Sequence, residues 1–179
     1  MARYAAFLRG VNLGRHRKVS GAELKSCFEE MGFEQAETFR TSGNVVFDAG
    51  REPRGKLTDT IEGALAKSLG YEVTVFVRTA QEIEAIAEHE PFPAQLVTAS
   101  MGKLQVSMLN GKPSAAARKR VLALATEDDR LAFGDRELYW LPSGGIRDSA
   151  LNGKAIEDLL GPSTMRTMGT VELLAAKYF

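Results

Sequence analysis

Two hydrophobic periods alternate along the first 78 residues, and their order restricts the fold more than any other feature of the sequence. Residues 4–8 form a nearly continuous apolar run that ends at Arg9 and Gly10, which predicts a strand buried on both faces. The following elements are predicted from their spacing as helices at 24–31 and 57–69 and as strands at 37–40, 44–48 and 73–77. The predicted order is therefore β-α-β-β-α-β.

A second β-α-β-β-α order follows residue 79, and a last helix, at about 170–178, replaces or follows the final strand. The β-α-β-β-α-β order of the first 78 residues is the split βαβ arrangement of ferredoxin-like domains. We therefore predict an α+β protein with antiparallel sheets and helices packed on one face. The predicted halves are ferredoxin-like, one at 1–78 and one at 79–179, the second including a linking helix and a C-terminal helix. Because the halves share no matching sequence, this duplication is inferred from element order.

Local signals agree with the predicted helices. Ser20 and Glu23 match a capping box, and so do Thr79 and Glu82. Cys27, the only cysteine, falls on the apolar face of the first helix, so we interpret it as a small core residue. One cysteine permits neither an intrachain disulfide nor a cysteine-based zinc site.

Charge is unevenly distributed although its total is zero. Residues 1–25 hold six basic side chains and one acidic side chain, a net charge of +5, and the remainder carries −5. This pattern excludes a uniformly basic nucleic-acid surface and leaves a local anion site open. The sequence has no apolar run of about 18 residues and no signal-peptide pattern, so we expect a cytoplasmic protein with no membrane partner.

Several segments resemble domain-of-unknown-function family 1697, a bacterial group. The specific ones are Phe7–Asn12 and Ser42–Phe47, supported by Lys18-Val19 and Glu90–Phe92. Arg166–Val171 keeps the arginine and Thr-Val of the family's C-terminal Arg-Asn-Trp-Asn-Thr-Val segment but lacks its tryptophan and both asparagines. The resemblance implies a cytoplasmic α+β fold of two ferredoxin-like halves, and it implies no activity.

Strand adjacency predicts where a ligand would bind. In the predicted sheet the first and third strands are antiparallel neighbours, so the loop after the first strand lies beside the hairpin before the third. Guanidinium groups, amides, hydroxyls and the start of the first helix would then meet at one rim, where they suit phosphate or carboxylate. The predicted ligand-binding residues are Arg9, Gly10, Asn12, Arg15, Lys18, Arg40, Ser42, Gly43 and Asn44.

Other interpretations of this rim stay open. The glycines and asparagines would also suit turns with no ligand. The partner could be a small anion, a nucleotide or, less favoured, a nucleic-acid end. RNA-recognition domains share the element order and stack bases on aromatic side chains of their strands. Here Phe47 is the only aromatic residue in the third-strand segment that would correspond to their motif. A small enzyme could use Arg9 and Arg40 as electrostatic stabilisers. A structural or oligomerising module using sheet edges is a third alternative, and the oligomeric state is not predicted.

Neither a cofactor nor a metal is predicted, because His16 and His89 are far apart and outside any ligand pattern. The run 127–129 is interpreted as a solvated acidic loop. The second half repeats the rim more weakly, with Asn110-Gly111-Lys112 after its first strand and with Lys154 and Arg166 as further cations. On its strand 137–141, alternation predicts that only one of Tyr139 and Trp140 faces the core.

Overall fold

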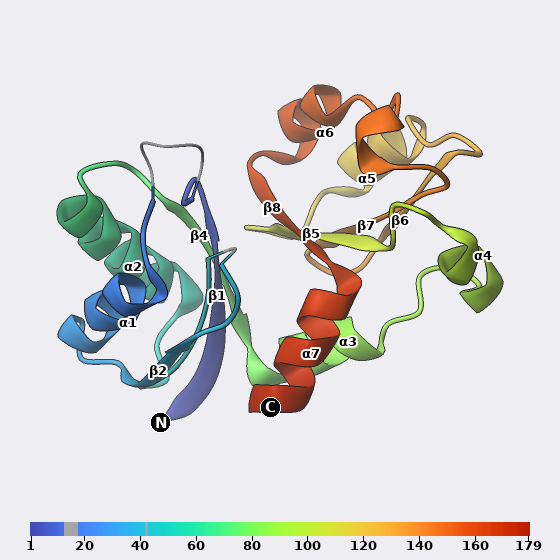
Figure 1. Ribbon diagram of the computed structural model, residues 1–179. Helices are drawn as coiled ribbons and strands as arrows, with labels where there is room; N and C mark the ends of the chain where they lie inside the picture. The colour runs from blue at the N-terminus through green and yellow to red at the C-terminus, as the bar shows by residue number, and fades with distance from the viewer. Residues whose placement is uncertain (13–17, 42) are drawn as a thin grey trace. The chain divides into compact units, whose positions relative to one another are not determined.

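The computed structural model describes residues 1–12, 18–41 and 43–179 (Figure 1). Two compact units divide the chain: unit 1 comprises Met1–Glu84 and Leu174–Phe179, and unit 2 comprises Ala85–Leu173. The first elements are β1 (Ala2–Arg9), α1 (Gly21–Glu30), β2 (Glu34–Thr38), β3 (Asn44–Ala49), α2 (Arg54–Leu69), β4 (Thr74–Thr79) and α3 (Ala80–Glu88). The remaining ones are α4 (Ala94–Ala99), β5 (Gln105–Leu109), α5 (Ala115–Leu122), β6 (Asp129–Phe133), β7 (Glu137–Pro142), a 3-10 turn (Ile146–Asp148), α6 (Gly153–Leu160), β8 (Ser163–Thr167) and α7 (Met168–Tyr178).

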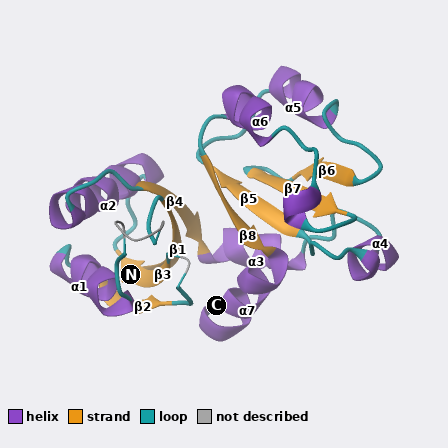
Figure 2. Cartoon of the chain, turned by 45° about the horizontal axis from the view of Figure 1, so that its top comes forward, coloured by secondary structure: helices purple, strands orange, loops and turns teal. Residues whose placement is uncertain are grey.

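Each unit contains one antiparallel sheet, and the described strands form the orders β2-β3-β1-β4 and β6-β7-β5-β8 (Figure 2). The two orders correspond strand for strand, so the α+β class and the two similar halves are confirmed. Because β8 precedes α7, the last helix follows the final strand of the second half and does not replace it.

The correspondence extends to individual hydrogen bonds. Leu8 N donates to the Gly43 carbonyl at 2.8 Å, and Leu109 N donates to the Arg136 carbonyl at 2.9 Å, each beyond the same end of the central strand pair. Each half also buries an arginine on its fourth strand. Arg78 pairs with Ala5 and Arg166 with Val106, and both guanidinium groups donate to the carbonyl of the preceding residue, at 3.1 and 2.8 Å. These matches support the predicted duplication.

The core of unit 1 lies between its sheet and helices α1 and α2, which cover one face (Figure 1). Period-two alternation brings Ala6, Phe47 and Val77 to this face, where none is more than 2% exposed. The helices contribute side chains at 3.6-residue spacing, namely Leu24, Cys27, Phe28, Leu57, Ile61 and Leu65. Cys27 is thus buried as expected, and it lies 3.1 Å from the Ser68 hydroxyl.

The predicted caps and alternation are also found. Thr79 N donates to Glu82 Oε2 at 2.9 Å and Glu82 N donates to Thr79 Oγ1 at 3.2 Å, which completes the second capping box. Gly70 ends α2 with a φ of +75° and donates its N–H to the Ala66 carbonyl. In β7 the alternation puts Trp140, which is partly exposed, on the helix side of the sheet, and Tyr139, which is buried, on the opposite face.

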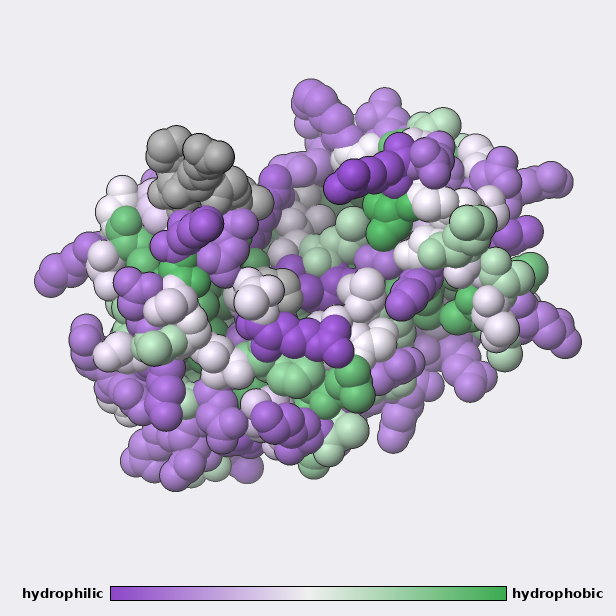
Figure 3. All heavy atoms as spheres, viewed as in Figure 1, coloured by the Kyte–Doolittle hydropathy of each residue, from purple (hydrophilic) through white to green (hydrophobic). Residues whose placement is uncertain are grey.

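The chain surface has the usual mixture of residues. On the face drawn in Figure 3, hydrophilic residues dominate and hydrophobic ones form small patches, which fits a chain with 26% charged residues. In the described ranges, no helix has both the length and the apolar character needed to cross a membrane.

Candidate functional site

The loop after β1 and the hairpin before β3 lie side by side at one end of the first sheet. The register pairs Phe7 with Asn44, and the Leu8–Gly43 hydrogen bond continues the contact beyond the strands. The expected adjacency of these two segments is therefore observed. We call the described part of this region, residues 9–12, 18–20 and 39–44 except 42, the basic rim.

Asn12 ties the basic rim together. Its Nδ2 donates to the Thr41 carbonyl at 2.7 Å, and its Oδ1 accepts the N–H of Val19 at 3.0 Å. One side chain thus joins the loop after β1 to the hairpin and to the approach to α1. It also adopts a φ of +56°, a left-handed conformation that asparagine tolerates better than most residues. The function of these two contacts is to shape the loops.

Asn44 has an equally structural position. Its side chain is fully buried and its Nδ2 donates to the Phe39 carbonyl at 2.8 Å, while Phe39 N donates to the Asn44 carbonyl at 2.9 Å. These bonds close the hairpin. The buried amide of Asn44 is therefore used to hold the turn.

Left-handed backbone concentrates in the two facing loops. Gly10 has a φ of +94° and Gly43 of +71°, and Arg40 reaches +59° without being glycine. At Gly43 an added Cβ would lie 2.5 Å from Val11 Cγ2, so this position needs glycine for space as well as for φ. Such conformations cost free energy and persist where the surrounding structure requires them, which is common at binding sites.

The predicted cations have different surroundings. Arg9 is partly buried at the end of β1, whereas Lys18 and Arg40 are exposed. The Arg40 guanidinium carbon lies 5.5 Å from the centre of the Phe39 ring, a distance that suits a cation–π contact. Arg15 and Ser42, also predicted to bind the ligand, lie outside the described residues.

The start of α1 holds the predicted capping box. Ser20 N donates to Glu23 Oε2 at 2.7 Å, and Glu23 N donates to Ser20 Oγ at 3.1 Å. The backbone N–H of Ser20 and then its hydroxyl lower the pKa of the Glu23 carboxyl, so the group is ionised at neutral pH. The capping box therefore brings a negative charge to the positive end of the helix dipole.

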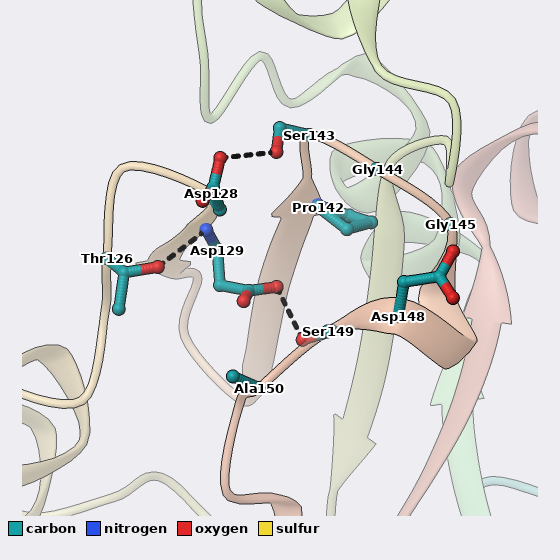
Figure 4. A pocket seen from close by; sticks show the side chains of 10 residues that line it. All are labelled: Thr126, Asp128, Asp129, Pro142, Ser143, Gly144, Gly145, Asp148, Ser149 and Ala150. Atoms are coloured by element: carbon teal, nitrogen blue, oxygen red, sulfur yellow. Dashed lines mark hydrogen bonds between the residues drawn. The ribbon is translucent and has the colours of Figure 1, made fainter.

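A second concave region lies within unit 2, at one end of β6 and β7, and the sequence did not predict it (Figure 4). Its volume is about 430 Å³ and its walls include Asp128, Asp129 and Asp148. Asp129 is 3% exposed and accepts hydrogen bonds from Trp140 Nε1 at 2.8 Å and from Ser149 Oγ at 2.7 Å. The interpretation of 127–129 as a solvated run is therefore wrong for Asp129, because the fold supplies two donors that sequence spacing cannot reveal.

This acidic pocket does not resemble a metal centre or an anion site. Asp128 accepts the Ser143 hydroxyl at 2.8 Å, so its carboxylate serves the turn. In the part of the chain that the structure describes, no cluster of three or more histidine, cysteine, aspartate or glutamate side chains could hold a metal ion. Three carboxylates would also repel an anionic ligand.

The cations of the second half serve local structure. Lys154 forms an ion pair with Asp158 one helical turn away, at 2.9 Å. Arg166 is 8% exposed and donates to Thr164 Oγ1 and the Met165 carbonyl, both at 2.8 Å. Burial lowers its pKa to about 10, so it stays protonated at neutral pH.

Comparisons with known proteins identify a family and a similar fold. A family model described as "Protein of unknown function (DUF1697)" matches residues 1–139. A solved structure described as conserved bacterial protein SP0830 from Streptococcus pneumoniae is similar over 99% of each chain, with 21% sequence identity and a TM-score of 0.73. At that identity the likeness concerns the fold alone. Among curated proteins, none matches this sequence.

Proposed function

The chain belongs to the DUF1697 family of proteins of unknown function, and we propose that it binds a small anionic or phosphorylated ligand at the basic rim. The observation that carries the proposal is the pair of hydrogen bonds made by Asn12. They fix Val19, which follows Lys18, and Thr41, which follows Arg40. Two exposed cations are thereby held next to the strand end that carries Arg9.

The chemistry of these groups favours an anion. Guanidinium groups bind phosphate and carboxylate through paired N–H donors, and an ammonium group adds a mobile point charge. In this proposal Arg9, Lys18 and Arg40 contact the ligand, together with the loop amides. Asn12, Asn44, Gly10 and Gly43 hold the loops in the conformation that presents those cations.

The proposal is tested by titrating inorganic phosphate and a nucleoside triphosphate into the parent protein and into Arg40→Ala and Lys18→Ala. Loss of one charge-assisted contact should weaken binding about tenfold, and the affinity of the parent should fall as salt is raised. Asn12→Ala should also weaken binding, because the two cations lose their common support.

Arg51→Ala is the matched control. Arg51 is exposed and belongs to the same unit, but it follows β3 and so lies beyond the opposite end of that strand from the basic rim. Its removal should leave the affinity unchanged. If Arg40→Ala and Lys18→Ala bind every anion as tightly as the parent and Arg51→Ala do, the basic rim is not the ligand site.

A further inference from the structure

We propose that unit 2 contains a second binding site, an apolar cavity that takes a small uncharged aromatic molecule. The cavity lies between the helix side of the second sheet and α6, and its volume is about 250 Å³. Its wall includes Ser107, Leu138, Trp140, Ile156, Ser163 and Met165. This site is separate from the basic rim and does not depend on the function proposed for it.

The duplication shows what this cavity replaces. The equivalent hydrogen bonds of Leu8 and Leu109 align Ala6 with Ser107, each two residues earlier on the central strand. Across the sheet, Ala6 pairs with Val45 and Val77. The corresponding partners of Ser107 are Leu138 and Met165. The cavity therefore occupies the place where unit 1 has its helix–sheet core.

Exposure confirms that this face is closed in one unit and open in the other. Val77 is 2% exposed, whereas Met165 at the equivalent position is 41% exposed. Phe47 is fully buried, whereas Trp140 is partly exposed. The reason lies in the helices: α1 and α2 bury several side chains each, while in α6, described along its whole length, no side chain is buried.

The mouth of the cavity carries apolar side chains in contact with solvent. Ile146 and Met165 both belong to its wall, and they are 40% and 41% exposed. Exposed apolar surface around a concavity is typical of a ligand site, because a bound molecule removes that surface from water.

The ring of Trp140 is held in an orientation that suits stacking with an aromatic ligand. Its indole N–H is satisfied by Asp129, which is itself nearly buried and also accepts the hydroxyl of Ser149. The ring is thereby fixed in orientation and needs no hydrogen bond from a ligand, which leaves its surface for stacking. Asp129 is a positioning residue that acts through Trp140.

The wall also limits the size and charge of the ligand. Among the residues that the structure describes, no charged side chain lines the cavity, and the polar groups of the wall include the hydroxyls of Ser107, Ser149 and Ser163. A charged ligand would lose its hydration without gaining a counter-ion. The volume exceeds the roughly 150 Å³ that accommodates benzene, so one substituted ring or a fused pair of rings fits.

Trp140 is the only tryptophan of the chain, so its fluorescence reports on this cavity directly. The probe is 4-nitrobenzyl alcohol, a neutral substituted ring that quenches tryptophan by contact. We expect saturable quenching with a Kd on the order of 1 mM or tighter. The charged analogue 4-nitrobenzoate should bind more than about tenfold more weakly, because the cavity offers no cation.

Ser107→Leu extends a side chain from the cavity floor and should weaken binding of the neutral probe at least about tenfold. Ser26→Leu, the same change at an exposed site on α1, is the control and should bind like the parent. Ile156→Phe blocks the cavity from the helix side and provides a second test if Ser107→Leu unfolds. Quenching that does not saturate, equal binding in the blocked variants, or preference for the benzoate would overturn the proposal.

Discussion

The two units place the same strands in the same order but use the helix side of the sheet differently. In unit 1 that side is a closed core in which Phe47 lies 5.1 Å from Phe28 and 5.7 Å from Tyr4, measured between ring centres. In unit 2 the corresponding cluster of buried residues consists of Val121, Leu131 and Leu138, with partly buried neighbours around them. A repeated topology therefore does not require a repeated core.

The comparison suggests a division of tasks. Dense packing makes unit 1 a rigid support for strained loops, because left-handed residues such as Asn12 and Arg40 persist only where neighbours hold them. The helix side of the sheet in unit 2 is packed less closely and contains a cavity next to Trp140. Each of the two proposed sites thus matches the packing of the unit that would carry it.

The largest effect should come from opening the closed core. Phe47→Ala should lower the free energy of unfolding by about 3–5 kcal/mol, because it removes a buried ring and leaves a cavity among aromatic neighbours. Met165→Ala, on the open side of unit 2, should cost under about 1 kcal/mol. Urea unfolding followed by circular dichroism measures both values. Equal losses would mean that the two units are packed alike.

A smaller effect should come from the loop that the closed core supports. Gly43→Ala should destabilise the protein by more than about 1 kcal/mol, since the new Cβ meets Val11 at a left-handed φ. Gly63→Ala is the control: it lies within α2 with nothing near its Cβ position, and should stabilise by up to about 1 kcal/mol. Melting temperatures of the two variants measure whether their stabilities change in opposite directions. A neutral Gly43→Ala would mean that the hairpin is not constrained as described.

Much of this comparison could be predicted, and the missing part has a physical cause. Apolar periodicity and caps are local, so the element order, the Ser20 and Thr79 caps and the adjacency of Arg9 with the hairpin followed from sequence. The buried state of Asp129 did not, because its donors, Trp140 and Ser149, are 11 and 20 residues away. The cavity was missed for a similar reason: α6 has a regular apolar spacing, and spacing does not show how closely a helix approaches its sheet.

The smallest predicted effect uses the helix that follows the first strand of each sheet, α1 after β1 and α5 after β5. In both, a serine hydroxyl accepts the N–H three residues on, at 3.1 Å: Ser20 from Glu23 in α1, and Ser114 from Ala117 in α5. Only α1 has the carboxylate that completes a capping box, so Ala117→Glu should supply it to α5 and stabilise unit 2 by about 0.5 kcal/mol.

The stability that a capping carboxylate contributes should depend on pH. Hydrogen bonds from Ser20 lower the pKa of Glu23 below its usual value of 4.5, so its contribution to stability is complete above that pH and is lost as the pH falls through the lowered pKa. Glu23→Gln should remove that acid-side loss. The gain from Ala117→Glu should disappear over the same acidic range, as melting curves between neutral and acidic pH would show. A gain that survives full protonation would not come from the ionised carboxylate of a capping box, and would make the two helices less alike than their serine contacts suggest.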